Sequence, residues 1–304
     1  MLGLRKSPLC ALALCALVRA APAEVKKPPL PPGRDPGGVA VALFTTGIDY
    51  TDPEVALRLA RDGEGELIGW DAADADNRPF AARGGAANWG GDGTLLARAL
   101  GGRGRRLVAV RVSATDPASL ARAVAFIAAT PARIAVVPMW SSAKAAWEPF
   151  RQAVLQHGDL LLIAAAGDEG KDIDREPVWP AAFQLANVLV VTAPPGGAGE
   201  ADSAPNGGAR LVDAVVTRGP GRSPPANTSL AAMLAADALA GCWPQLLAAH
   251  RGGALKAALL AETAKAQRAQ GAQGAQGAQG TASKPVISGC AQGAPHGNRG
   301  AGGG

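Results

Sequence analysis

Ser229 carries a hydroxyl at the start of a long segment rich in Ala and Leu that predicts a helix over residues 229–247. A serine hydroxyl is a weak nucleophile unless a base removes its proton. The usual base is a histidine, and the chain has three, at His157, His250 and His296. His157 comes at a predicted helix end before Gly158, where a C-terminal cap explains it. A second role for Ser229 is to cap the N-terminus of its helix.

A group of carboxylates follows the second predicted strand. Asp71, Asp74 and Asp76 lie there, and Asp49 follows the first strand. Calcium prefers carboxylate and carbonyl oxygens, so these residues are candidate ligands. They are equally typical of loop turns, and we favour the turns. We therefore expect no metal site and no cofactor.

The elements that must position these residues alternate between strands and helices. Residues 71–93 are polar and rich in Gly, Asp and Asn, which predicts a long loop. Continuous apolar strands that alternate with helices predict a parallel sheet covered on both faces. Strands are predicted over 39–44, 66–70, 106–112, 134–139, 160–166 and 187–193, and helices over 52–60, 94–100, 117–130, 143–157, 229–247 and 253–265.

The first 23 residues predict a signal peptide. Arg5 and Lys6 precede an apolar run over 9–18 that is too short to span a bilayer, and small residues over 21–23 suit cleavage. An uncleaved anchor is the alternative. No other stretch is apolar enough to span a membrane, so we expect a secreted or periplasmic protein without stable membrane insertion.

Three further regions follow the signal peptide. Residues 24–38 predict a Pro-rich linker, and 39–265 a single domain, for which the 48% of hydrophobic residues supply a sizeable core. Residues 266–304, which repeat a Gly-Ala-Gln triplet over 270–280, predict a low-complexity tail that cannot fold alone. The tail either has a structural role of its own or is a by-product of a repetitive gene.

The charge of the chain bears on the class of partner, and its cysteines bear on disulfide bonding. The net charge of +5 falls close to balance once Arg5, Lys6 and Arg19 are removed with the signal peptide. No dense Lys/Arg stripe with interleaved aromatics remains, so we expect no nucleic-acid partner. Cys242 and Cys290 remain after cleavage. In an oxidising compartment they either pair or stay a buried thiol and a tail thiol.

Several short segments carry a family resemblance, and they come in the family's order. Residues 41–50 read VALFTTGIDY, 69–77 run from GWD to DN, 91–94 read GDGT, and 164–168 read AAAGD. WPA at 179–181, NV at 187–188 and TSLAA at 228–232 follow. Together they resemble the subtilisin-like serine peptidases over about residues 39–264. The resemblance implies a three-layer α/β fold with a mainly parallel sheet between helices. An unrelated Ala-rich α/β domain is the alternative.

The resemblance also assigns positions to the catalytic roles. Ser229 falls on the nucleophile, Thr45 on the carboxylate that orients the base, Asp92 on the histidine base, and Asp168 on the asparagine of the oxyanion hole. Thr45 is neutral, and an ordinary aspartate has a pKa of about 3.9, too low for a base near neutral pH. An ionised Asp168 would repel an oxyanion. The family's substrate-side motif SLGG is altered at residues 140–142, which read WSS.

Two functions follow from these substitutions. The first is an inactive peptidase homologue, a scaffold or binding protein whose residual cleft holds a peptide or protein. The second is a peptidase active in acid, because the related sedolisins use a carboxylate as the base and an aspartate in the oxyanion hole. Asp92 is shorter than their glutamate, and Leu96 stands where they place a second carboxylate.

Overall fold

An eight-stranded sheet forms the centre of the molecule in the computed structural model, which describes residues 27–81, 86, 89–197, 204–219, 222–274 and 284–289. The strand order is β2-β3-β1-β4-β5-β6-β7-β8, and every neighbouring pair is parallel. The strands are β1 (Val39–Thr45), β2 (Trp70–Asp71), β3 (Arg105–Arg111), β4 (Ile134–Val137), β5 (Leu161–Ala165), β6 (Val188–Thr192), β7 (Ala214–Thr217) and β8 (Val286–Ser288).

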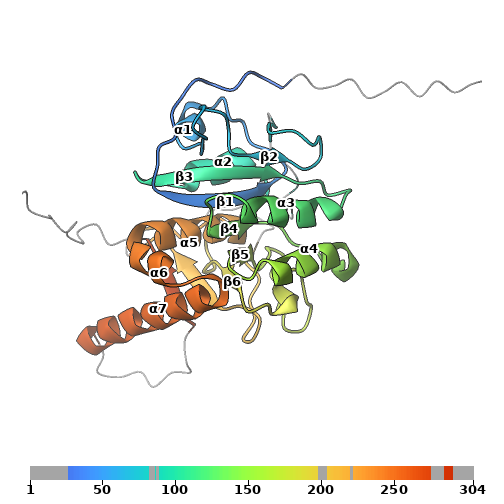
Figure 1. Cartoon of the computed structure of the whole chain (residues 1–304). Helices are drawn as coiled ribbons and strands as arrows, with labels where there is room; N and C mark the ends of the chain where they lie inside the picture. The colour runs from blue at the N-terminus through green and yellow to red at the C-terminus, as the bar shows by residue number, and fades with distance from the viewer. Residues whose placement is uncertain are drawn as a thin grey trace, which may run out of the picture.

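Helices cover both faces of the sheet (Figure 1). They are α1 (Pro53–Ala56), α2 (Gly93–Ala99), α3 (Ala118–Ala128), α4 (Lys144–Gln156), α5 (Thr228–Cys242), α6 (Pro244–Ala249) and α7 (Gly252–Gly274), with a 3₁₀ turn, η1, at Ala181–Phe183. One apolar core joins one face to α2, α5, α6 and α7, and a second joins the other face to α3 and α4. The predicted three-layer α/β fold is confirmed.

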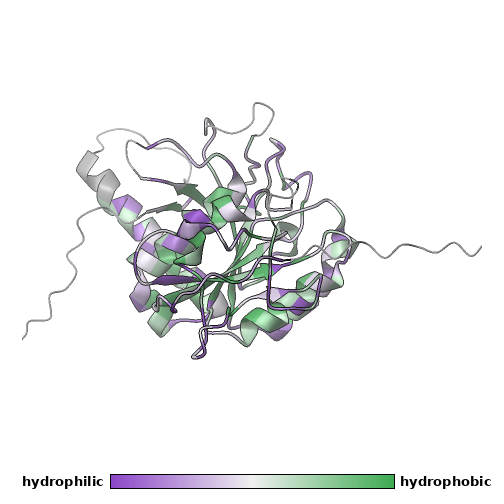
Figure 2. Ribbon diagram, turned by 90° about the horizontal axis from the view of Figure 1, so that it is seen from above, coloured by the Kyte–Doolittle hydropathy of each residue, from purple (hydrophilic) through white to green (hydrophobic). Residues whose placement is uncertain are grey.

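The burial of β1 explains its unbroken apolar sequence. Val41 and Leu43 point into the first core, and Ala42 and Phe44 into the second. Successive side chains of a strand point to opposite faces, so a strand covered on both faces has no polar position. Figure 2 shows the green, hydrophobic strands in the middle of the molecule, with purple, hydrophilic residues along the outer helices.

The long helix predicted over 229–247 is two helices. α5 ends at Cys242, and Pro244 begins α6. Proline lacks the N–H that would continue a helix but suits the first turn of a new one, so the chain breaks there. Cys242 is disulfide-bonded. The alternative of a free buried thiol at Cys242 is therefore wrong. The partner of Cys242 lies outside the described residues, so the structure does not test the pairing with Cys290.

The helix predicted over 52–60 is only one turn long. After α1 the chain pairs with the sheet: Leu107 N donates to Arg58 O at 2.6 Å, and Ala60 N donates to Leu107 O at 2.8 Å. Hydrogen bonds to β3 replace those that would have extended the helix. The strand predicted over 66–70 is reduced to β2, and β7 was not predicted.

The described part of the expected linker lies against the domain. We call residues 27–38 the N-terminal strap. Tyr50 Oη donates to Pro28 O at 2.6 Å, and Arg61 Nη2 donates to Pro31 O at 2.7 Å. Asp35 accepts hydrogen bonds from the backbone N of Arg61 and from Arg106. Residues 27–38 are therefore docked and are not a free linker.

The sheet also extends past residue 265, where we expected the domain to end. α7 continues to Gly274, and β8 pairs with β7 as an edge strand whose Ile287 is fully buried. The remaining expectations for the tail, and the signal peptide with its cleavage site, fall on residues outside the described ones. Among the described helices, none is long and apolar enough to cross a membrane.

Candidate functional site

The four residues assigned from the sequence lie at the carboxyl edge of the sheet. Thr45 ends β1, and Asp168 follows β5 by three residues; β4 lies between these two strands. Parallel strands end at the same edge, so these positions are neighbours. α5 begins at this edge, because Thr228 Oγ1 accepts a hydrogen bond from Gly167 N at 3.1 Å. α2 begins beside Thr45: a Cβ on Gly93 would lie 2.0 Å from Thr45 Oγ1.

The hydroxyl of Ser229 is tied to the backbone. Its Oγ donates to Pro138 O at 2.7 Å, and the residue is 4% exposed. The helix cap is a different residue: Asn227 is the N-cap of α5, and its side chain accepts from Leu230 N at 2.8 Å. The capping role considered for Ser229 is therefore wrong. Within the described part of the chain, no titratable side chain bonds to this hydroxyl.

Thr45 closes a turn. Its Oγ1 donates to Gly47 O at 2.9 Å and accepts from Gly47 N at 3.1 Å, and the residue is buried. Both hydrogen-bonding roles of the hydroxyl are thus used within three residues of chain. The neutral side chain supplies no charge at this end of β1.

Asp92 caps α2. Its Oδ1 accepts from Thr94 N at 2.8 Å and from Leu95 N at 3.4 Å, the arrangement in which aspartate stabilises a helix start. Leu96 is buried in the first apolar core. The helix therefore explains both residues through capping and packing.

Asp168 is half-buried behind the start of α5. Its Oδ1 accepts from Thr228 N at 2.8 Å. Burial raises the pKa of the Asp168 carboxyl to about 6, the negative charge of Glu169 adds to the rise, and the hydrogen bonds from Thr228 oppose it. The carboxyl is thus protonated in mild acid and charged at neutral pH.

A polar cluster that the sequence did not reveal closes the same edge. Trp140 is 2% exposed, and its Nε1 donates to Glu169 Oε1. Asn206 Nδ2 donates to Glu169 Oε2 at 2.7 Å and to Ala166 O at 2.9 Å. Gly167, at φ +98°, lies beneath: a Cβ there would come 2.4 Å from Asn206 Nδ2. The altered motif at 140–142 was the one available signal, and Asn206 belongs to no motif we identified.

The described histidines lie at the opposite edge of the sheet. His157 is the C-cap of α4, as predicted, and His250 is the C-cap of α6. Gly252 N donates to Asp159 O at 3.0 Å, which places both histidines near the amino end of β5. The five residues of β5, at about 3.3 Å each, separate them from the edge that holds Ser229. His296 lies outside the described residues.

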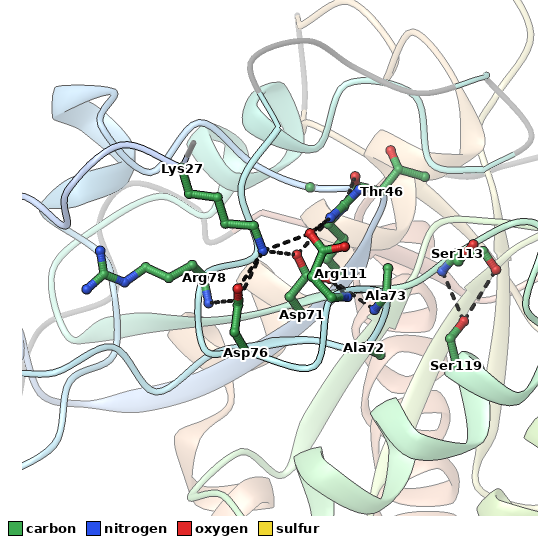
Figure 3. A network of polar contacts seen from close by, with 12 residues as sticks. Lys27, Thr46, Asp71, Ala72, Ala73, Asp76, Arg78, Arg111, Ser113 and Ser119 are labelled. Carbon is green, nitrogen blue, oxygen red and sulfur yellow. Dashed lines mark hydrogen bonds and ion pairs between the residues drawn. The ribbon is translucent and has the colours of Figure 1, made fainter. Parts of the chain in front are cut away.

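The loop that carries Asp71, Asp74 and Asp76, which we call the acidic loop, is paired with cationic side chains (Figure 3). Lys27 Nζ lies 2.7 Å from Asp71 and 2.9 Å from both Asp74 and Asp76. Arg111 lies 2.8 Å from Asp71 and from Asp74. Asp71 Oδ1 also accepts from the next backbone N–H groups of its turn, at 3.0 Å. These aspartates hold a turn and bind the strap, and within the described residues no cluster could hold a metal.

Comparisons with known proteins identify the fold. No family model matches the sequence, and no curated protein matches it. The solved structure of the nisin leader peptidase NisP from Lactococcus lactis is similar, with a TM-score of 0.53, 14% identity, and coverage of 82% of this chain and 85% of that one. A cold adapted subtilisin-like serine proteinase has a TM-score of 0.49 and 18% identity, over 75% of this chain and 83% of that one. The likeness to NisP shows the fold, and the predicted subtilisin-like fold is confirmed.

Proposed function

We propose that this chain is an exported protein of subtilisin-like fold that does not hydrolyse peptides and serves as a scaffold or binding module. The carrying observation is the bond from Ser229 Oγ to Pro138 O, made by a residue that is 4% exposed. Serine peptidase chemistry needs a base that takes the hydroxyl proton. A backbone carbonyl cannot take that proton, and the described histidines lie at the far edge of the sheet.

The other assigned positions support the same proposal. Thr45 is used in a turn, Asp92 in a helix cap, and Asp168 in a bond to the start of α5. Each side chain has a local structural role that explains its presence. In a working site these positions would orient the base, supply it, and donate to the oxyanion.

The expected partner is a peptide or protein at the carboxyl edge of the sheet. The solved structure with a similar fold is a leader peptidase, and its name states that it acts on a peptide. The buried Trp140 and its bond to Glu169 close part of this edge. This supports a surface to which a partner binds, and it argues against a cleft that surrounds a scissile bond.

The proposal is tested by assaying the full chain against a mixed peptide library from pH 3 to pH 9. The Ser229→Ala variant is the control, because it removes the hydroxyl and little else. We expect both proteins to leave the library intact at every pH. Saturable cleavage by the wild type alone would contradict the proposal.

An acid-active peptidase is the second candidate. The observation in its favour is Asp168, whose raised pKa of about 6 lets the carboxyl donate a hydrogen bond in acid. Such an enzyme would cut the library only at low pH, and both Ser229→Ala and Asp92→Asn would abolish cutting. A flat profile down to about pH 3 eliminates this candidate.

Export is proposed on the N-terminal pattern alone. If residues 1–23 are removed on export, the exported chain begins at Glu24, which N-terminal sequencing detects. The intact Met1 terminus on protein recovered from outside the cytoplasm would contradict cleavage there.

A further inference from the structure

A pocket lies between α4 and the segment after β5. Its volume is about 620 Å³, and none of the four assigned residues lines it. Lys144, Glu148 and Arg151 lie along one face of α4, and Trp179 and Phe183 face them from the 174–184 segment, with Arg210 nearby. We call this the α4 pocket; α4 is labelled in Figure 1.

An aromatic pair forms one wall of the α4 pocket. The rings of Trp179 and Phe183 meet edge to face with centroids 6.4 Å apart, and the Arg151 guanidinium lies 5.9 Å from the Phe183 centroid. The wall is fixed in place, because Trp179 and Ser141 exchange two backbone hydrogen bonds of 2.9 and 3.0 Å. A preformed aromatic surface lowers the entropy lost when an apolar group binds.

The carboxylates of the pocket are already satisfied by the protein. Glu148 Oε1 accepts from Arg151 at 2.8 Å and from Gln152 at 2.7 Å. Asp174 accepts from the backbone N of Arg210 at 2.7 Å and of Leu211 at 2.8 Å. These bonds hold the pKa of both carboxyls below the usual range, so the two groups stay charged and paired.

The cations of the pocket are the groups left with free donors. The ammonium of Lys144 and the guanidinium of Arg210 donate to no side chain or carbonyl among the described residues. Both residues are exposed, so a ligand reaches them without unfolding the wall. A guanidinium offers a planar fork that matches a carboxylate. The polar groups of the pocket that remain without a hydrogen-bond acceptor are therefore the two cations, and they lie beside an aromatic wall.

We propose that the α4 pocket binds an acidic peptide segment, with carboxylates on Lys144 and Arg210 and an aromatic or aliphatic side chain against Trp179 and Phe183. The inference is independent of the peptidase question, because none of the four residues assigned to catalytic roles lines the pocket. It assigns the pocket a class of ligand whatever the activity at Ser229.

The test uses three capped tetrapeptides at about 50 mM salt: Glu-Phe-Glu-Gly, its Gln-Phe-Gln-Gly counterpart, and Glu-Ala-Glu-Gly. Binding to the full chain is measured by calorimetry. We expect the first peptide to bind about tenfold more tightly than the second and several-fold more tightly than the third. The preference over Gln should shrink at high salt, because exposed charges are screened.

Variants locate the site. Lys144→Ala and Arg210→Ala should each weaken binding of Glu-Phe-Glu-Gly about threefold to tenfold, and neither side chain makes a hydrogen bond or a salt bridge with another described residue. Arg175→Ala is the matched control: it lies on the same segment but outside the pocket, 86% exposed and paired with Asp172. It should leave affinity unchanged.

Three results would overturn the proposal. One is equal affinity for the Glu and Gln peptides, and another is equal loss in Arg175→Ala and in the two pocket variants. The third is competition by a ten-nucleotide oligothymidylate as strong as that by the peptide, which would make the surface a general anion site.

Discussion

At the scale of the residue, the reactive groups at the carboxyl edge of the sheet have structural roles. Ser229, Thr45 and Asp92 each make hydrogen bonds that a folded chain needs whether or not it is an enzyme. Asp168 differs, because its carboxyl is charged at neutral pH in a half-buried place. Removing that charge should therefore stabilise the protein.

Asp168→Asn should raise stability at neutral pH and leave it unchanged in acid. The folded pKa of about 6 lies above the ordinary aspartate value of 3.8, so the folded state binds more protons between those values. Wild-type stability thus falls as pH rises from about 4 to about 6, by roughly 3 kcal/mol at most. The variant lacks this fall. Urea unfolding at pH 4 and pH 8 measures it.

Asp159→Asn is the matched control for this change. Asp159 is exposed, and its carboxylate bonds to no described residue. It should show no such gain. A gain in Asp168→Asn that is the same at pH 4 and pH 8 would contradict the charge argument.

At the scale of the element, helix starts and strand edges decide what could be predicted. β1, β3, β4, β5 and β6 were predicted because burial on both faces leaves a continuous apolar run. β7 is short, and β8 places only two apolar residues within a tail of Gly, Ala and Gln, so neither produced a pattern. Their place in the sheet depends on long-range pairing, which periodicity does not record.

The cap of α2 gives the first prediction at this scale. Asp92→Ala should cost about 1 kcal/mol in the free energy of unfolding, because Thr94 N and Leu95 N lose their acceptor. Asp92→Ser keeps a capping oxygen and should cost a few tenths at most. Equal losses in the two variants, measured by thermal or urea unfolding, would show that the charge matters and the cap does not.

Strand β8 gives the second prediction at the scale of the element. Ile287 is fully buried in the first core, so Ile287→Ala should cost about 3 kcal/mol. Val286 on the same strand is only half-buried, and Val286→Ala should cost about 1 kcal/mol. Chemical denaturation of the full chain compares them. If both substitutions are silent, β8 contributes nothing to the stability of the sheet.

At the scale of the whole molecule, the strap connects the N-terminal segment to the candidate site. Lys27 binds the acidic loop, Arg111 binds the same loop, and Arg111 Nε donates to Thr46 O at 3.1 Å beside Thr45. The chain of contacts runs from residue 27 to the end of β1.

Lys27→Met should loosen the strap without removing its bulk. Asp71 is fully buried and would keep Arg111 as its one cationic partner among the described residues, so we expect a loss of about 1–2 kcal/mol and faster proteolysis between residues 27 and 38. Lys27→Arg keeps the charge and should retain most protection. Unchanged cleavage in Lys27→Met would mean that the strap is held by its other contacts alone.

The sequence allowed the site positions to be placed but not their contacts. Motif order predicted that Thr45, Asp92, Asp168 and Ser229 would be the relevant residues, and the shared edge of parallel strands explains why they are neighbours. The bonds of Ser229 to Pro138 and of Asn206 to Glu169 join residues 91 and 37 positions apart. Such pairings are set by packing, and no local pattern encodes them.

The central claim is that Ser229 is not an activated nucleophile, and covalent labelling tests it most directly. The full chain is treated with a fluorophosphonate, which phosphonylates activated serines, from pH 3 to pH 9, and the intact mass is measured beside Ser229→Ala. We expect no adduct on either protein at any pH, while an active subtilisin labels fully in the same buffers at neutral pH. A stoichiometric adduct on the wild type that is absent from Ser229→Ala would contradict the claim.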